Sequence, residues 1–182
     1  MRATDYPYCQ SPFTVLAHRG GAGMAVNKGI ENTLAAFGHA VEVGCTYLET
    51  DVHATSDGVL VAFHDPILDR VTESGGVIAA MPWHKVKQAK VGGEPIPTLD
   101  EIFDAFPEAF INIDIKHDGA TMPLIDVLSR HRAWSRVCVG SFSSKRIQTF
   151  RRLVQGRTAT AVGPVGVGWA VIGPHSMQMA QS

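Results

Sequence analysis

Short apolar runs rich in β-forming residues alternate with amphipathic helical stretches along most of this chain. This alternation constrains the fold more than any other feature of the sequence. The expected strands are 13–17, 47–52, 59–63, 110–115, 137–141 and 158–162, and the expected helices are 33–43, 98–106, 123–131 and 145–153. Strands separated by helices are typical of mainly parallel βα units. The sequence therefore predicts an α/β fold, for which a TIM-type (β/α) barrel is the obvious closed form and a flat doubly wound sheet the competitor.

The length of the chain bears on how such a barrel is completed. The chain has 182 residues, whereas an eight-stranded barrel typically takes about 250. Residues 64–97 are less regular and hold several Gly and Pro residues, so we interpret them as a small insertion after the third strand. We expect a single domain over 1–182, truncated at the C-terminus after about six of eight βα units, with 163–182 as an unassigned tail. An open sheet exposes unpaired edges, which a homodimer or a rearranged tail would cover.

Composition excludes several classes of protein. Hydrophobic residues make up 45% and charged residues 18% of the chain, which is typical of a globular domain and argues against disorder. The net charge is -1, so no basic footprint for nucleic acid is expected. No apolar run approaches the length of a membrane span, and the first residues lack the apolar core of a secretory signal. Three scattered cysteines give no disulfide framework, so a cytoplasmic location is expected.

Ionisable side chains follow or end four of the expected strands. They are His18 and Arg19, Glu49 and Asp51, His64 and Asp65, and Asp114 and Lys116. In a parallel barrel the carboxyl ends of the strands converge on one face, where active sites lie. We therefore expect these groups to form one site.

The acidic residues of this set are candidates for binding a metal ion. Glu49 and Asp51 are two residues apart, so on a strand their side chains point to the same side. A lone Glu-x-Asp pair is commonly a solvated strand end, but the flanking residues here are apolar. Asp114 lies in an isoleucine-rich strand. Three carboxylates without cysteine favour Mg²⁺ or Ca²⁺, while use of the histidines as ligands would favour Zn²⁺ or Mn²⁺.

The remaining members of the set suit phosphodiester cleavage. That reaction needs one group to activate a nucleophile and another to protonate the leaving oxygen, and His18 and His64 are suited to both tasks. The fork of Arg19 suits a phosphate group, and Lys116 supplies a second positive charge. Either cation is alternatively a plain ion-pair partner of the carboxylates. The other histidines are interpreted as structural.

Several motifs together resemble the glycerophosphodiester phosphodiesterase family, within the phosphodiesterase superfamily that is similar to phosphatidylinositol-specific phospholipase C. They are Ala17-His18-Arg19-Gly20-Gly21, Glu31-Asn32-Thr33-Leu34-Ala35-Ala36-Phe37, Leu48-Glu49-Thr50-Asp51-Val52, Phe63-His64-Asp65-Pro66, Leu68-Asp69-Arg70-Val71-Thr72, Gly92-Gly93-Glu94-Pro95-Ile96-Pro97-Thr98-Leu99 and Ile113-Asp114-Ile115-Lys116. Each motif alone is weakly specific, but their order and spacing are highly specific. The similarity runs from about residue 15 to 142.

This resemblance implies an activity and a role for each site residue. It implies hydrolysis of glycerophosphodiesters to glycerol 3-phosphate and an alcohol, in which a neighbouring glycerol hydroxyl attacks phosphorus and water opens the resulting cyclic phosphate. The implied metal ligands are Glu49, Asp51 and Asp114, the acid–base pair is His18 and His64, and the phosphate-binding residues are Arg19 and Lys116. Glu31 and Asn32 are expected to contact these site residues and keep them in place without touching the substrate.

The chain departs from the family pattern at three places. Ile30 stands where Pro is usual, and Asp114 stands where many members have Glu, which is one methylene longer. Family members continue through two further strands, and Trp169 does not fit the position of the Trp that their last strand carries. Two alternatives therefore stay open: a lipid phosphodiesterase similar to lysophospholipase D, which an apolar rim would favour, and a truncated remnant that binds metal or phosphate without catalysis.

Overall fold

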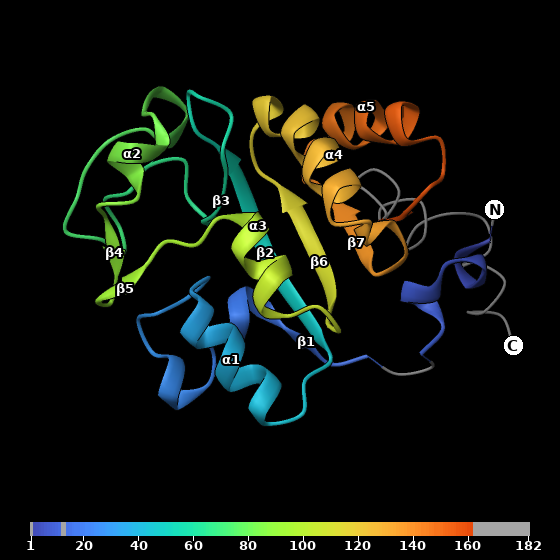
Figure 1. Cartoon of the computed structure of the whole chain (residues 1–182), viewed down its shortest axis with the longest axis horizontal. Helices are drawn as coiled ribbons and strands as arrows, with labels where there is room; N and C mark the ends of the chain where they lie inside the picture. The colour runs from blue at the N-terminus through green and yellow to red at the C-terminus, as the bar shows by residue number, and fades with distance from the viewer. Residues whose placement is uncertain (1, 12–13, 162–182) are drawn as a thin grey trace, which may run out of the picture.

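The computed structural model describes residues 2–11 and 14–161, which form an α/β fold around one main sheet (Figure 1). Five strands of this sheet are parallel and lie in the order β1 (Leu16–Ala17), β2 (Tyr47–Ala54), β6 (Phe110–Ile115), β7 (Val137–Gly140) and β8 (Ala159–Thr160). The β2–β6 pairing is the most extensive and aligns Asp51 with Asp114. The parallel βα arrangement expected from the sequence is therefore confirmed for these strands.

The third strand corrects that expectation. β3 (Leu60–Ala62) pairs antiparallel with β2, with Ala62 opposite Val52 and Leu60 opposite Ala54. The chain reverses through the turn at Asp57-Gly58, where Gly58 has φ +83° and the backbone N–H of Val59 donates to the hydroxyl of Thr55. β3 is thus the second arm of a hairpin and not a parallel barrel strand. Because β3 leads back along β2, its end still approaches the carboxyl half of β2.

The helices pack around this sheet and share the main core with the strands. They are α1 (Leu34–Glu42), α3 (Leu99–Ala105), α4 (Thr121–Arg130) and α5 (Ser144–Val154). The hydroxyl of Thr33 caps α1, and Thr98 with Glu101 forms the expected capping box of α3. The described residues also contain seven short 3-10 helices: Ala3–Asp5, Pro7–Cys9, His18–Gly20, Ala25–Asn27, Ile78–Ala80, Asp118–Ala120 and Ala133–Ser135. The main core joins side chains of all four helices to the strands, as with Phe37, Phe103 and Phe150.

The segment 64–97 forms a separate lobe beside β3 (Figure 1). It contains α2 (Trp83–Val86) and a small hairpin of β4 (Lys90–Val91) and β5 (Glu94–Pro95). Its apolar side chains, including Leu68 and Ile78, form a second small core with Val61 of β3 and with Phe63. The interpretation of this lobe as an insertion stays a prediction.

The first described residues pack against the amino ends of the two central strands. The ring of Tyr8 lies 5.2 Å from that of Tyr47 and 6.0 Å from that of Phe110, and the hydroxyl of Tyr47 donates to the carbonyl oxygen of Tyr8. Burial raises the pKa of the Tyr8 phenol well above its usual value. This segment therefore covers the end of the sheet opposite to the polar strand ends.

Some boundaries differ from those expected. Only Leu16 and Ala17 of the expected strand 13–17 pair with β2, and Phe13 lies outside the described residues. β2 extends two residues beyond 52 because it pairs with β3. The tail 163–182, including Trp169, also lies outside them. Within residues 2–11 and 14–161, no helix is long and apolar enough to cross a membrane.

Candidate active site

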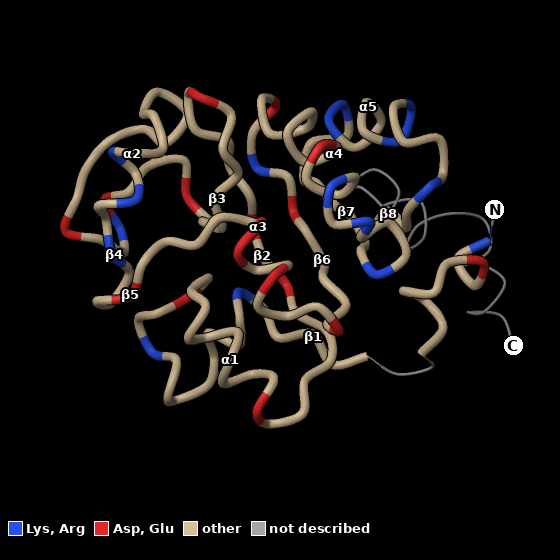
Figure 2. The backbone as a smooth tube through the Cα atoms, viewed as in Figure 1, with Lys and Arg blue, Asp and Glu red and all other residues tan. Residues whose placement is uncertain are grey.

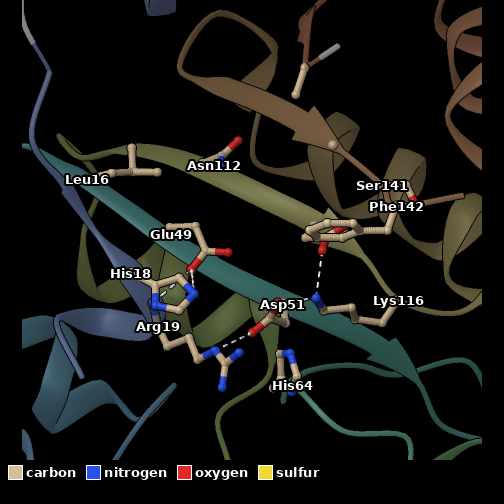
Figure 3. A pocket seen from close by; sticks show the side chains of 13 residues that line it. Leu16, His18, Arg19, Glu49, Asp51, His64, Asn112, Lys116, Ser141 and Phe142 are labelled. Atoms are coloured by element: carbon tan, nitrogen blue, oxygen red, sulfur yellow. Dashed lines mark hydrogen bonds and ion pairs between the residues drawn. The ribbon is translucent and has the colours of Figure 1, made fainter. Parts of the chain in front are cut away.

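The carboxyl ends of the parallel strands surround one pocket of about 700 Å³ (Figure 3). Seven of the residues proposed from the sequence line it: His18, Arg19, Glu49, Asp51, His64, Asp114 and Lys116. Glu31 and Asn32 do not line the pocket but contact residues that do. The structure therefore brings together seven of the eight ionisable residues that were expected to meet, although His64 arrives from the antiparallel β3 rather than from a parallel strand. The eighth, Asp65, lies outside the pocket lining and contacts His64.

The three carboxylates are buried at the base of this pocket. Glu49, Asp51 and Asp114 are only 7%, 2% and 9% exposed. Burial, together with the negative charge of Asp51, raises the pKa of Glu49 to about 7. Oδ1 of Asp114 is buried and has no hydrogen-bond partner. The site thus concentrates negative charge that is only partly compensated.

Lys116 lies between two of these carboxylates. Its Nζ is 2.8 Å from Oδ1 of Asp51 and 2.7 Å from Oδ2 of Asp114. Burial disfavours the ammonium ion, but hydrogen bonds to Asp114 and Asp51 outweigh that effect and raise the pKa of Lys116. The ring of Phe142 lies over the same ammonium group at 5.2 Å. Lys116 is therefore a charged group that serves as the counter-ion of the acidic cluster.

Arg19 contacts the same cluster from the loop after β1. Its backbone adopts φ +49°, which is unusual for a residue with a side chain, and its N–H donates to Oε2 of Glu49 at 2.8 Å. Nη1 of Arg19 donates to Oε1 of Glu31 at 3.2 Å, and Nε is 3.5 Å from Oδ2 of Asp51. Asn32, also at positive φ, donates from Nδ2 to Asp51 at 3.2 Å. Glu31 and Asn32 thus restrain Arg19 and Asp51 by hydrogen bonds from outside the pocket.

The two histidines differ in how firmly they are held. The side chain of His18 is 66% exposed, and its Nε2 is 3.9 Å from Oε2 of Glu49. The side chain of His64 is 31% exposed, and its Nδ1 is 2.6 Å from Oδ1 of Asp65. A carbonyl oxygen only accepts, so Nε2 of His53 donates to the backbone oxygen of His64, at 3.2 Å. His64 is therefore fixed by partners on both its ring and its backbone.

Asn27 supports the loop that carries His18 and Arg19. Its Nδ2 donates to the carbonyl oxygens of Gly20 at 2.9 Å and Ala36 at 3.2 Å, and its Oδ1 accepts from Nδ1 of His39 at 2.6 Å. Asn27 is fully buried. Sequence reasoning missed Asn27, because a single Asn in a loop carries no recognisable signal. The interpretation of His39 as a structural histidine agrees with this contact.

Apolar side chains form the other part of the pocket wall. Phe142 is 81% exposed and Leu16 is 38% exposed, and both line the pocket (Figure 3). No apolar rim was evident from the sequence, because these residues are far apart along the chain and Leu16 was interpreted only as part of a strand. They widen the range of groups that the pocket can contact beyond a phosphate.

The donor chemistry of the site fits a hard divalent cation. Carboxylate oxygens are the ligands that Mg²⁺ and Ca²⁺ prefer, and the unpartnered oxygen of Asp114 can still accept a ligand bond. The described residues nevertheless contain no group of three or more His, Cys, Asp or Glu side chains arranged around one metal position. Lys116 instead bridges Asp51 and Asp114. The cluster thus fits a cation by chemistry, with Lys116 as its present counter-ion.

Known proteins resemble this chain in sequence and in structure. The sequence profile of the glycerophosphoryl diester phosphodiesterase family matches residues 18–160. The chain belongs to this family. It is 38% identical over 149 residues to a probable glycerophosphodiester phosphodiesterase 2 of Mycobacterium tuberculosis. The aligned region covers 81% of this chain and 55% of that protein.

Two further similarities extend this comparison. Lysophospholipase D GDPD1 of Homo sapiens is 38% identical over 115 residues, covering 56% of this chain and 35% of that protein. A phosphodiesterase of Oleispira antarctica, solved with the product sn-glycerol-3-phosphate, has a TM-score of 0.74 and 28% identity, covering 85% of this chain and 66% of that one. The chain therefore spans less than two thirds of the length of each of these relatives.

Proposed function

We propose that this chain hydrolyses glycerophosphodiesters to glycerol 3-phosphate and an alcohol, as a metal-dependent phosphoric diester hydrolase. The observation that carries the proposal is the composition of one pocket wall: two histidines, two cations and three buried carboxylates. Family membership and the name of the Mycobacterium relative support the same activity. A cytoplasmic location is proposed on the scattered cysteines alone.

Each group of residues has a proposed part in the reaction. One of His18 and His64 accepts the proton of a glycerol hydroxyl, whose oxygen attacks phosphorus. The other donates a proton to the alcohol oxygen as its bond to phosphorus breaks. A cyclic phosphate results, and water opens it in a second step. Arg19 and Lys116 bind the phosphate oxygens, where positive charge opposes the negative charge of the transition state.

Glu49, Asp51 and Asp114 are the residues that would hold a divalent cation, Mg²⁺ or Ca²⁺. Such an ion supplies charge stabilisation to the phosphoryl oxygens when it is bound. Glu31 and Asn32 keep Arg19 and Asp51 in place through the contacts described above. With a cation on these carboxylates, Lys116 would no longer be needed as their counter-ion and would be free, with Arg19, to contact the phosphate.

A second candidate function has a specific observation in its favour. The exposed Phe142 and Leu16 offer apolar contacts at the pocket, which suit a substrate whose glycerol carries an acyl chain. The name of the human relative, lysophospholipase D, agrees with that substrate class. A non-catalytic remnant that binds metal or phosphate is the outcome if neither substrate is cleaved.

We also propose that the parallel sheet is part of a TIM-type barrel of which the described residues supply only some βα units. The likeness to the Oleispira phosphodiesterase supports this proposal. In this view residues 1–182 are a single domain, 64–97 are its insertion and 163–182 its tail. A homodimer that covers the open edge of the sheet is the proposed assembly.

An assay for glycerol 3-phosphate tests the activity. The folded protein is incubated with glycerophosphocholine or lysophosphatidylcholine, with Mg²⁺, Ca²⁺ or excess chelator. Release of glycerol 3-phosphate only with a divalent cation supports the first function. If only lysophosphatidylcholine is cleaved, to lysophosphatidic acid and choline, the second function is supported. If neither substrate is cleaved, the hydrolase proposal is contradicted.

A further inference from the structure

Arg70 lies outside the pocket, in the insertion, and contacts two acidic residues at once. Its Nη2 donates to Oε1 of Glu31 at 2.5 Å, and its Nε donates to Oδ2 of Asp65. Glu31 belongs to the loop before α1, whereas Asp65 directly follows His64 in the chain. One planar guanidinium group therefore ties the insertion to the loop that follows β1.

Each of these two acids also contacts a residue that lines the pocket. The second oxygen of Asp65, Oδ1, is 2.6 Å from Nδ1 of His64, and Oε1 of Glu31 also accepts from Nη1 of Arg19 at 3.2 Å. Charges alternate along the whole row, from Arg19 through Glu31, Arg70 and Asp65 to His64. His64 and Arg19 line the pocket while the three residues between them do not. Arg70 is thus in a position to act on the site only through its neighbours.

The Asp65 contact determines which nitrogen of His64 carries the proton. Hydrogen bonds from Arg70 and His64 outweigh the effect of burial and hold the pKa of Asp65 below its usual value, so the carboxylate is ionised at neutral pH. An ionised carboxylate only accepts hydrogen bonds. Nδ1 of His64 must therefore donate, which leaves Nε2 of the neutral ring with its lone pair free. That state is the one a proton acceptor needs.

A purely stabilising role for Arg70 explains these contacts less well. The side chain of Arg70 is 46% exposed, and ion pairs of exposed side chains contribute little to stability because water screens them. Its fork instead fixes the orientation of two carboxylates that each hold a pocket residue. Such an arrangement fixes the orientation of side chains and adds little to the stability of the fold.

We propose that Arg70 is a positioning residue that orients Asp65 and Glu31, and through them fixes the ring of His64 and the side chain of Arg19. The insertion would thereby be part of the catalytic apparatus and not a peripheral lobe. This inference rests on the proposed function of His64 and Arg19 as acid–base and phosphate-binding groups.

The direct test is the tautomer of His64, observed by NMR of protein labelled with ¹⁵N-histidine at a pH where the ring is neutral. In the unaltered protein we expect the proton on Nδ1. Arg70→Met keeps an unbranched apolar stem but removes the guanidinium fork, so a measurable share of the Nε2–H form should appear. Arg70→Lys retains charge and can reach only one of the two acids, so it should give an intermediate share, and it is also the variant to use if Arg70→Met does not fold.

A matched control exists elsewhere in the chain. Arg130 pairs through Nη2 with both oxygens of Asp100, and Asp100 accepts from Nε2 of His131 at 2.8 Å, which is a similar Arg–Asp–His row away from the pocket. Arg130→Met should leave the His64 tautomer and turnover unchanged. For Arg70→Met we expect kcat to fall by about tenfold to 100-fold, by analogy with the range seen for groups that orient metal-binding histidines.

The outcomes separate the inference from the function on which it rests. An unchanged His64 tautomer in Arg70→Met overturns the inference, whether or not turnover falls. An unaltered protein that cleaves neither substrate contradicts the proposed function, while the tautomer comparison still decides the role of Arg70. A changed tautomer with kcat equal to that of the unaltered protein also overturns the inference.

Discussion

At the level of single residues, Glu49 has the property that most directly links the site to a cation. Burial and the charge of Asp51 raise the pKa of this carboxyl to about 7, well above the usual value of 4.5. The proton must leave before the carboxylate can bind a metal ion. Affinity for Mg²⁺ or Ca²⁺ should therefore increase up to about tenfold per pH unit below pH 7 and level off above it, as measured by calorimetry.

Glu49→Gln provides the control for this measurement. It keeps the shape of the side chain but has no proton to lose, so binding should be weaker and its slope near pH 7 should disappear. The sign follows from the raised pKa, because an acid whose pKa is raised is protonated, and so unable to bind, over a wider range of pH. An affinity that is constant between pH 5.5 and 7.5 in the unaltered protein contradicts this account.

The sequence revealed some site residues more readily than others. Glu49 and Asp51 could be placed on one face because a strand has a period of two residues, and both line the pocket. Arg70 and Phe142 could not be found in this way, because their significance depends on partners distant in the sequence. Arg70, for example, contacts a residue 39 positions away. Asn27 was missed although its partners are nearby, because a single Asn in a loop carries no recognisable pattern.

At the level of elements, the loop between β1 and α1 depends on one buried side chain. Asn27→Ala would leave the carbonyl oxygens of Gly20 and Ala36 without their donor. Loss of a buried donor costs about 1 to 3 kcal/mol in the free energy of unfolding. Because this loop carries His18 and Arg19, we also expect turnover to fall at temperatures where the variant remains folded. Thermal unfolding and the phosphodiesterase assay measure the two effects.

Thr98→Ala is the matched control for this loop. It removes the cap of α3, where the hydroxyl of Thr98 accepts from the N–H of Glu101. Loss of such a cap costs about 1 kcal/mol, but α3 carries none of the pocket residues. Turnover by the folded Thr98→Ala protein should match that of the unaltered chain. Equal losses of turnover in both variants would mean that destabilisation alone explains the Asn27 effect.

The helices were easier to predict than the direction of the strands. Thr33 and Thr98 are local caps with recognisable sequence patterns, and both helices begin where these patterns place them. The alternation predicts mainly parallel strands, but Asp57-Gly58 between two apolar runs is typical of a hairpin, and β3 pairs antiparallel with β2. His64 reached the expected site because a hairpin also returns the chain to β2.

At the level of the whole molecule, the sheet is open at both ends within the part of the chain that the structure describes. There β1 pairs only with β2, and β8 only with β7. Val15 and Leu16, at the β1 edge, are 57% and 38% exposed. Exposed apolar edges favour association, so light scattering should detect a dimer at micromolar concentration. Val15→Lys should shift the protein to monomer, and a monomeric unaltered protein would contradict the proposed assembly.

The central claim is that the two histidines act together on a phosphodiester in this pocket. The measurement that tests it most directly is a ³¹P NMR time course of glycerophosphocholine with the protein and Mg²⁺ or Ca²⁺. We predict that the substrate resonance is replaced by that of glycerol 3-phosphate, and that His18→Ala and His64→Ala each slow this change by about 10²- to 10⁴-fold. A folded, metal-loaded protein that produces no new phosphorus resonance, or a His64→Ala variant as fast as the unaltered chain, would contradict the claim.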